Sequence, residues 1–244
     1  MPAAVVQGGE YRLYTKTYSS GQVSSTPALV VVLHGDAPRH KPEYQYIFAG
    51  VVAEQNTDVV AVGLLRPGYT DPEGHTSDGV RGLTTGDNYN ARNVDSIAAA
   101  IGELERQWHP RKVVVVGHSG GSAITANILG RHPELIDGAI IVSCPCDVVK
   151  WRAHMYEVQR WSGWLDEINT VSPIDVLPGI ASQVPVRLLV GTADDVTPPS
   201  LSVAYEAAAK KLGKNVTLTQ LQGVDHEALF DPAVLATIAE LTKP

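Results

Sequence analysis

Six short apolar runs recur along the chain, and most of them are continuous rather than alternating with polar residues. Continuous runs of Val, Ile and Leu are typical of strands that helices cover on both faces. The runs predict strands at Leu29–Leu33, Val59–Leu64, Val113–Gly117, Ala139–Ser143, Val186–Gly191 and Val216–Leu221. One further segment, Tyr11–Tyr18, does alternate, which favours an antiparallel strand at the edge of the sheet.

The segments between these runs carry apolar residues at helical spacing. They predict helices at Glu43–Gln55, Ala91–Trp108, Gly121–Arg131, Leu201–Leu212 and Pro232–Leu241. Strands that alternate with helices indicate an α/β protein, with a mainly parallel, doubly wound sheet flanked by helices.

Two regions interrupt this alternation. Residues Arg66–Asn90 are rich in Gly, Asp, Thr and Pro, which predicts a long surface loop. Residues 144–184 separate two predicted strands and form an insertion. Within it, mostly apolar side chains recur at helical spacing, at Trp151, His154, Met155, Val158, Trp161 and Leu165. This helix is expected either to form a short lid over a binding site or simply to pack on the sheet.

Composition restricts the class of protein. A chain of 244 residues with 44% hydrophobic residues suits a single globular domain over 1–244. The formal net charge of −7 argues against a nucleic acid or an anionic membrane as partner. No apolar run approaches the roughly 20 residues that span a bilayer, and residues 1–10 lack the pattern of a secretory signal. A cytoplasmic location is therefore expected; the sequence gives no indication of the oligomeric state.

Cys144 and Cys146 are the two cysteines of the chain, separated by Pro145. In extended geometry their side chains would point the same way at an unsuitable separation, so we expect two thiols rather than a disulfide. No partners at ligand spacing accompany them, so no metal site is expected there. The acyl-transfer chemistry indicated by the next motif needs no metal or organic cofactor.

The motif Gly117-His118-Ser119-Gly120-Gly121 carries the strongest chemical signal. It lies between a run of four valines and a segment compatible with a helix. A serine at the apex of such a strand–turn–helix has an exposed hydroxyl, and Gly117 and Gly121 leave room for the sharp turn. The pattern indicates nucleophilic acyl transfer.

A serine hydroxyl needs a base to remove its proton and an acid to orient that base. Loops after two later predicted strands supply both. Asp194 and Asp195 follow Gly191, and His226 follows the last strand within Asp225-His226-Glu227. The order Ser, Asp, His is that of the α/β-hydrolases.

On these motifs, together with His34-Gly35 and Ser172-Pro173-Ile174-Asp175, the chain resembles the α/β-hydrolase superfamily over nearly its whole length. It is similar to the prolyl-oligopeptidase-like and small-esterase branches. The resemblance implies that Ser119 is the nucleophile, Asp194 the acid and His226 the base. Asp195 and Asp147 are the alternatives for the acid.

The same resemblance implies an oxyanion hole made by two backbone N–H groups. One belongs to Gly120, and the other to Asp36, with Ala37 as the alternative. The Asp36 side chain should turn away from the hole, because a carboxylate there would oppose the developing negative charge. Tyr69, Trp151, Met155 and Trp161 are expected to line the substrate pocket, although Tyr69 could equally pack on the surface.

These inferences predict a serine hydrolase that cleaves small or medium carboxylic esters through an acyl-enzyme intermediate, with a small acyl compound as its substrate. The alternatives are a peptidase or amidase, a thioesterase or an acyltransferase with the same triad. Peptidases of the prolyl-oligopeptidase-like branch, which the chain resembles, usually carry a further domain that gates substrate access, and 244 residues leave no room for one. A non-catalytic ligand-binding protein is the alternative from another class, since fold does not fix function.

Overall fold

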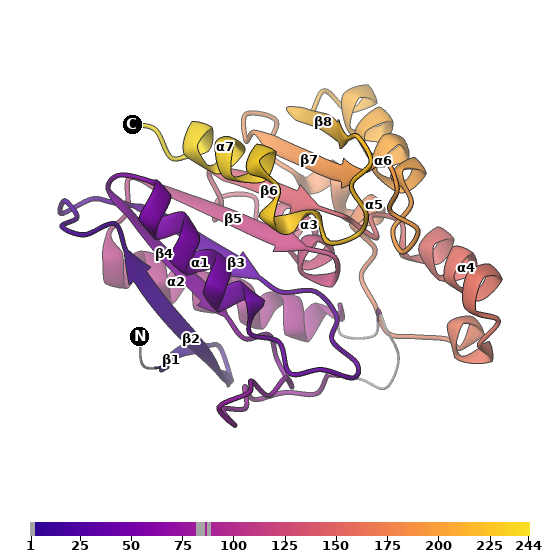
Figure 1. Cartoon of the computed structure of the whole chain (residues 1–244), viewed down its shortest axis with the longest axis horizontal. Coiled ribbons are helices and arrows are strands. Elements are labelled where there is room, and N and C mark those ends of the chain that lie inside the picture. The colour runs from indigo at the N-terminus through magenta and orange to yellow at the C-terminus, as the bar shows by residue number, and fades with distance from the viewer. Residues whose placement is uncertain (1–2, 82–85, 87–88) are drawn as a thin grey trace.

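The structure, a computed structural model, describes residues 3–81, 86 and 89–244. Its described strands form one eight-stranded sheet in the order β1-β2-β4-β3-β5-β6-β7-β8 (Figure 1). The strands are β1 (Ala4–Gly8), β2 (Tyr11–Ser19), β3 (Ala28–Leu33), β4 (Val59–Leu64), β5 (Lys112–His118), β6 (Gly138–Val142), β7 (Val186–Gly191) and β8 (Val216–Leu221). Strands β3 to β8 run parallel, whereas β1 and β2 pair in antiparallel fashion.

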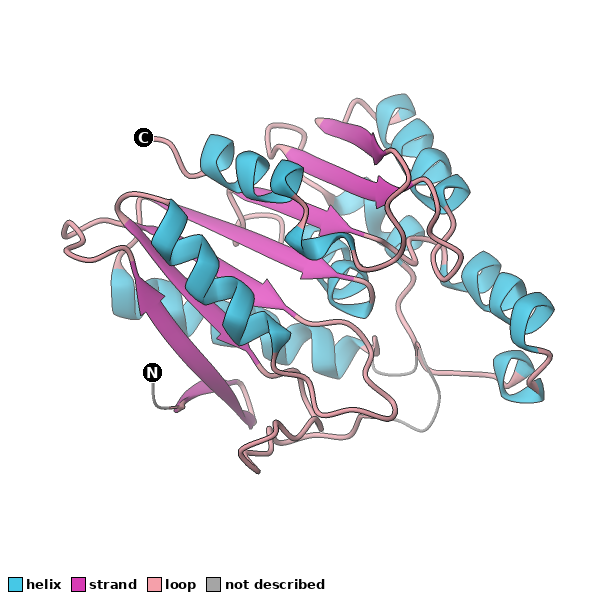
Figure 2. Ribbon diagram, viewed as in Figure 1, coloured by secondary structure: helices cyan, strands magenta, loops and turns pink. Residues whose placement is uncertain are grey.

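Helices cover both faces of the sheet (Figure 2). The longer ones are α1 (Tyr44–Gln55), α2 (Ala91–Trp108), α3 (Gly120–Arg131), α4 (Val148–Gln159), α6 (Pro199–Lys211) and α7 (Pro232–Leu241). Helices α1 and α7 pack on one face of the central strands, while α2, α3 and α6 pack on the other. Because both faces are buried, β3 and β4 carry no exposed residue, which explains their unbroken apolar sequence.

The predicted fold class is confirmed, and every predicted strand forms. The prediction of Tyr11–Tyr18 as the edge strand is wrong in one respect, because β1 pairs along its outer side and itself forms the edge. Two of the five residues of β1, Val6 and Gly8, are buried, so its alternation is too short to stand out in the sequence.

The strand order reverses at the centre of the sheet, and this determines where a site can form. From β3 the chain crosses to β4 on one side, and from β5 it crosses to β6 on the other. The loops after β3 and β5 therefore diverge and leave a crevice at the carboxyl ends of these strands. In open α/β sheets ligands bind at such a reversal.

The insertion between β6 and β7 divides into two parts. Helix α4 and the short 3-10 turn η1 (Ser162–Leu165) lie at the border of the molecule (Figure 1). The short α5 (Pro173–Val176) and η2 (Leu177–Gly179) instead pack against α3. The predicted helix through Leu165 is too long, because α4 ends at Gln159 and Arg160 adopts a left-handed conformation with φ of 53°.

The prediction of a surface loop over Arg66–Asn90 is wrong for several side chains. Arg66 and Tyr89 are fully buried and Tyr69 nearly so. Their polar atoms bond to the loop that follows β3, as described below, and these bonds make burial of a charged side chain tolerable. Residues 82–85 and 87–88 of the predicted loop lie outside the described residues.

The prediction of two free thiols is also wrong, because Cys144 and Cys146 form a disulfide. That prediction assumed an extended backbone. Ser143, however, adopts a left-handed conformation with φ of 51° where β6 ends, and the chain turns. The two Cα atoms come within 5.0 Å of each other, a distance that a disulfide spans.

None of the helices in the described part of the chain is long and apolar enough to cross a membrane.

Candidate active site

Ser119 lies at the apex of the turn between β5 and α3, in a conformation that few residues adopt, with φ of 53° and ψ of −121°. Backbone crowding makes this turn possible only with glycines around it. A Cβ on Gly117 would lie 2.3 Å from the carbonyl oxygen of Gly121, and a Cβ on Gly121 would lie 2.3 Å from that of Leu33. The serine hydroxyl is thereby lifted to the edge of the sheet.

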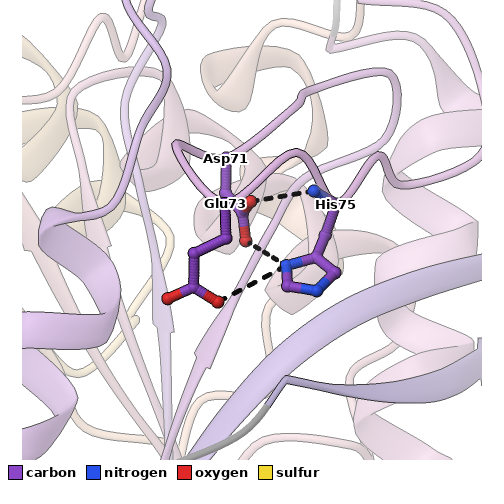
Figure 3. A group of neighbouring side chains, drawn as sticks. All are labelled: Asp71, Glu73 and His75. Atoms are coloured by element: carbon purple, nitrogen blue, oxygen red, sulfur yellow. Dashed lines mark hydrogen bonds and ion pairs between the residues drawn. The ribbon is translucent and has the colours of Figure 1, made fainter.

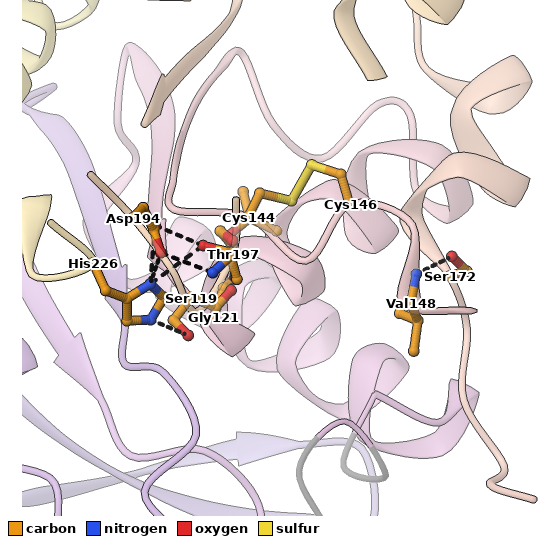
Figure 4. The surroundings of a disulfide bond; sticks show 11 residues. Ser119, Gly121, Cys144, Cys146, Val148, Ser172, Asp194, Thr197 and His226 are labelled. Atoms are coloured by element: carbon orange, nitrogen blue, oxygen red, sulfur yellow. Dashed lines mark hydrogen bonds and ion pairs between the residues drawn. A yellow bond between two sulfur atoms is a disulfide. The ribbon is translucent and has the colours of Figure 1, made fainter. Parts of the chain in front are cut away.

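The structure brings the three predicted residues of the triad together, although they come from loops after three different strands (Figure 4). Nε2 of His226 is 3.0 Å from Oγ of Ser119, and Nδ1 of His226 is 3.0 Å from both carboxylate oxygens of Asp194. A carboxylate can only accept, so the proton of the neutral imidazole belongs on Nδ1. Nε2 is then free to accept the proton of Ser119, as a general base must.

The two alternative acids lie elsewhere. Asp195 is exposed, and its backbone carbonyl accepts a hydrogen bond from His154 at 2.7 Å. Asp147 caps the first turn of α4, where its Oδ1 accepts from the N–H of Lys150 at 3.1 Å. Asp194 is therefore the carboxylate that the fold directs at the imidazole.

Asp194 is buried but well supplied with donors. The backbone N–H of Thr197 donates to Oδ1 at 2.7 Å, and the Thr197 hydroxyl donates to Oδ2 at 2.8 Å. Burial raises the pKa of Asp194, but the hydrogen bonds from His226 and Thr197 lower it by more than burial raises it. The net pKa therefore lies below its ordinary value. The carboxylate stays ionised and can stabilise a protonated imidazole.

Two backbone N–H groups near Ser119 have no hydrogen-bond acceptor among the described residues, those of Asp36 and Gly120. The N–H of Ala37, the alternative, donates to Oη of Tyr69 at 3.4 Å and is therefore occupied. Asp36 follows β3 and Gly120 begins α3, so the two free donors come from the two loops that diverge at the crevice. They can bind the oxygen of a tetrahedral intermediate.

The carboxylate of Asp36 has its own partners. Oδ1 accepts from the guanidinium of Arg66 at 3.0 Å, and Oδ2 accepts from Tyr89 Oη at 2.6 Å and from the N–H of Gly86 at 3.2 Å. Arg66 also donates to the carbonyl oxygen of His34 at 3.0 Å. The negative charge of Asp36 is thus balanced by a buried cation, which limits its repulsion of an oxyanion.

Ser119 opens into a cleft of about 1110 Å³. One wall is apolar and comes mainly from α4 and η1. The side chains that form it are Trp151, Met155, Trp161, Trp164 and Val196. The other wall is the polar loop after β3, and it brings Arg39, His40 and Lys41 to the cleft, with Glu43 and Glu227 nearby.

Of the four predicted pocket residues, Trp151, Met155 and Trp161 line this cleft, whereas Tyr69 does not. Tyr69 lies beneath the loop after β3 and borders a separate hollow with Lys41 and Arg81. Sequence reasoning missed Trp164 and the charged loop residues 39–41. Residues 39–41 follow closely after Asp36 and Ala37, the predicted oxyanion donors, and this closeness in sequence is the signal that could have identified them as cleft residues.

Helix α4 is tied to the loop that carries the acid. The indole Nε1 of Trp151 donates to the carbonyl oxygen of Val196 at 2.9 Å, and Nε2 of His154 lies 2.7 Å from that of Asp195. The Trp151 and Trp164 rings also stack edge to face, with centroids 5.3 Å apart. The apolar wall is therefore anchored to the same loop that orients His226.

A group of possible metal ligands lies in another loop. Ligand atoms of Asp71, Glu73 and His75 come within 4.8 Å of one another (Figure 3). Nδ1 of His75 is 3.0 Å from Oδ2 of Asp71, and the His75 N–H donates to Oδ1 at 2.9 Å. The ammonium of Lys16 pairs with Glu73. These contacts close the turn, and Lys16 already supplies the positive charge.

Two buried histidines make stability depend on pH. Burial, and secondarily the neighbouring His226, lower the pKa of His118 to about 4; burial, and secondarily Arg66, lower that of His34 well below its ordinary value. Between about pH 4 and 6.5 the unfolded chain therefore binds protons that the folded protein excludes. We expect the free energy of unfolding to decrease as the pH is lowered through this window, by up to about 1.4 kcal/mol per pH unit for each proton that only the unfolded chain binds.

Urea denaturation at pH 7, 5.5 and 4.5 checks this expectation. The His118→Gln variant removes one of the two groups, so its free energy of unfolding should fall less steeply than that of the wild type. Equal slopes for the two proteins would contradict the assignment of His118 as a buried neutral imidazole.

Comparison with known families places residues 84–241, more than half of the chain, in a match to the prolyl oligopeptidase family. No curated protein sequence matches the chain.

Solved structures with the same fold include peptidases and esterases. An acylaminoacyl peptidase from Pyrococcus horikoshii is 14% identical with a TM-score of 0.70; the match covers 98% of this chain but 39% of the peptidase, so this chain spans about two fifths of that protein. Est1E from Butyrivibrio proteoclasticus with bound ferulic acid is 17% identical with a TM-score of 0.69, covering 98% and 97%. An esterase from Pyrococcus furiosus is 14% identical with a TM-score of 0.73, covering 98% and 89%.

Proposed function

This chain belongs to the prolyl oligopeptidase family of α/β-hydrolases, and we propose that this serine hydrolase cleaves small or medium carboxylic esters. One observation carries the proposal. Oγ of Ser119, hydrogen-bonded to Nε2 of His226 at 3.0 Å, faces a cleft with an apolar wall on one side. Beside it lie two backbone N–H donors that have no acceptor among the residues that the structure describes.

The reaction follows from these positions. Oγ of Ser119 attacks the ester carbonyl carbon while Nε2 of His226 takes the hydroxyl proton, and Asp194 stabilises the imidazolium. The N–H groups of Gly120 and Asp36 bind the oxyanion. His226 then returns its proton to the departing alcohol, which leaves an acyl-enzyme. Water, deprotonated by His226, then attacks the acyl carbon; the bond between this carbon and Oγ breaks, His226 returns the proton to Oγ of Ser119, and the acid is released.

The apolar wall is the part of the cleft that suits an acyl chain. Trp151 and Met155 are almost fully buried, whereas Trp161 is 47% exposed. We infer that α4 and η1 act as a small fixed cap rather than a mobile lid, because Trp151 and His154 bond α4 to the loop of Asp194. A short insertion of this kind leaves room for small and medium acyl groups.

Enlarging this wall should shift the preferred chain length. In Met155→Ala the loss of a buried side chain on α4 opens the cleft, so kcat/KM for p-nitrophenyl acetate should fall several-fold while that for the octanoate rises relative to it. Val149→Ala, at an exposed position of the same helix, is the matched control and should leave the profile unchanged. The same profile in Met155→Ala as in the wild type would remove Met155 from the acyl site.

Peptide bond hydrolysis is the second candidate, and membership of the prolyl oligopeptidase family favours it. The two are separated by assaying p-nitrophenyl esters beside aminoacyl p-nitroanilides. Esters have the better leaving group, so a comparison of kcat/KM for the same acyl group is required. If kcat/KM for an anilide equals or exceeds that for the ester of the same acyl group, the proposed function changes from esterase to peptidase.

A further inference from the structure

A series of hydrogen bonds next to the triad joins two loops through the first residue of α1 and the last residue of β5. It begins at the backbone N–H of Gly35, which donates to Oη of Tyr44. Oη of Tyr44 lies 3.0 Å from Nδ1 of His118, and Nε2 of His118 lies 2.9 Å from the backbone carbonyl oxygen of His226. The series therefore connects the loop after β3, the end of β5 and the loop after β8.

The direction of each bond is determined. The carbonyl oxygen of His226 can only accept, so Nε2 of His118 carries a proton. The ring is neutral because burial lowers the pKa of His118 to about 4, so Nδ1 has no proton and accepts from the Tyr44 hydroxyl. The oxygen of Tyr44 in turn accepts from Gly35. Each donor in this series has one acceptor. If one donor and acceptor exchanged roles, the next hydrogen bond in the series could not form.

The two ends of this series of hydrogen bonds lie at the two parts of the site whose relative position matters for the reaction, the proposed oxyanion donor and the proposed base. Gly35 precedes Asp36, whose free N–H we assign to the oxyanion. The carbonyl of His226 belongs to the proposed base, and it also accepts a bond from the hydroxyl of Ser143 at 3.1 Å. Asp194 holds the His226 imidazole, whereas His118 and Ser143 hold its backbone.

We propose that His118 and Tyr44 are positioning residues that fix the distance between the base His226 and the oxyanion loop. The inference rests on the proposed role of Ser119 as nucleophile, but not on the choice of ester over peptide. His118 acts through the backbone of His226, and Tyr44 acts through the backbone of Gly35.

Two substitutions at position 118 separate the effect of the bond to Tyr44 from the effect of the bond to the His226 carbonyl. The amide nitrogen of glutamine lies near the place of Nε2, so His118→Gln can still donate to the His226 carbonyl. The side-chain oxygen of asparagine lies near the place of Nδ1, so His118→Asn keeps the Tyr44 bond and loses the bond to the base. Tyr44→Phe loses both the bond to His118 and the acceptor for Gly35.

The readout is the rate at which a fluorophosphonate labels Ser119, split into the maximal rate and the half-saturating concentration. Misplacement of a catalytic group by about 1 Å can cost about 100-fold in rate. We expect the maximal rate to fall about 10- to 100-fold in His118→Asn and in Tyr44→Phe, with the half-saturating concentration within about twofold of wild type. His118→Gln should retain at least about a third of the rate, since it restores the bond to His226.

Urea midpoints of all variants control for folding. Equal losses in His118→Asn and His118→Gln, or losses that follow the urea midpoint, would overturn the positioning role, as would unchanged labelling in His118→Asn. If the wild type labels at Ser119 but hydrolyses no ester, the esterase proposal fails while this inference is still tested by the labelling rates. If the wild type is not labelled, both are overturned.

Discussion

The Ser119→Ala variant is expected to lose hydrolysis by at least about 10,000-fold in kcat, with KM little changed. Alanine removes the nucleophile but keeps the backbone, so the substrate still meets Gly120, Asp36 and the apolar wall. The residual rate should come from direct attack of water on the bound ester, with the two N–H donors still stabilising the oxyanion. Steady-state kinetics on p-nitrophenyl butyrate measure the effect.

The loss should not be additive with that of a second triad variant. His226→Ala alone should cost about as much as Ser119→Ala, and the double variant should be no worse, because the residues act as a unit. Ser200→Ala, which replaces an exposed serine at the start of α6, controls for a nonspecific effect of losing a hydroxyl. A Ser119→Ala enzyme with more than about a tenth of wild-type kcat would contradict the role of Ser119.

Asp194→Asn is expected to lower kcat about 1,000- to 10,000-fold. Asparagine nearly matches the shape of the carboxylate, but its amide can donate to Nδ1 of His226. The Nδ1 proton would then be disfavoured, and Nε2, which must accept from Ser119, would carry the proton instead. The imidazolium formed during attack would also lose its counter-charge.

Asp195→Asn is the matched control, since the two aspartates are neighbours in the chain. Asp195 is exposed, and within the described part of the chain its backbone carbonyl is what accepts a hydrogen bond, from His154. Its variant should keep kcat within about twofold. If Asp195→Asn proved the more damaging of the two, the acid would have to be reassigned.

How far the sequence predicts this molecule depends on the range of the interactions involved. The buried strands were predictable because an unbroken apolar run such as that of β5 is a local consequence of burial on both faces. The motif around Ser119 was predictable for a similar reason, as the turn requires glycines at fixed offsets. The order of the three triad motifs could then be compared with that of a known superfamily.

The buried polar contacts could not be predicted, because they join residues far apart in the chain. Arg66 lies in a segment rich in turn formers, and only the fold brings it to Asp36, whose charge compensates its own. The disulfide escaped prediction because it depends on the left-handed conformation of Ser143. The bond between His118 and the backbone of His226 spans 108 positions and leaves no periodic signal.

Tyr69 illustrates the same limit from the other direction. A tyrosine in a loop after a strand near the site is a reasonable pocket residue on sequence alone. Its hydroxyl instead accepts from Ala37, and its ring lies against His34 with centroids 4.7 Å apart. The residue supports the loop after β3 rather than lining the cleft.

The most direct test of the account is the position of the covalent adduct that a fluorophosphonate forms with the native protein. Wild type, Ser119→Ala and Ser200→Ala should be incubated with the probe, digested and mapped by mass spectrometry. We predict one adduct, on Ser119, in the wild type and in Ser200→Ala, and none in Ser119→Ala. An adduct on another residue, or no adduct on the folded wild-type protein, would contradict the assignment of Ser119 as the nucleophile.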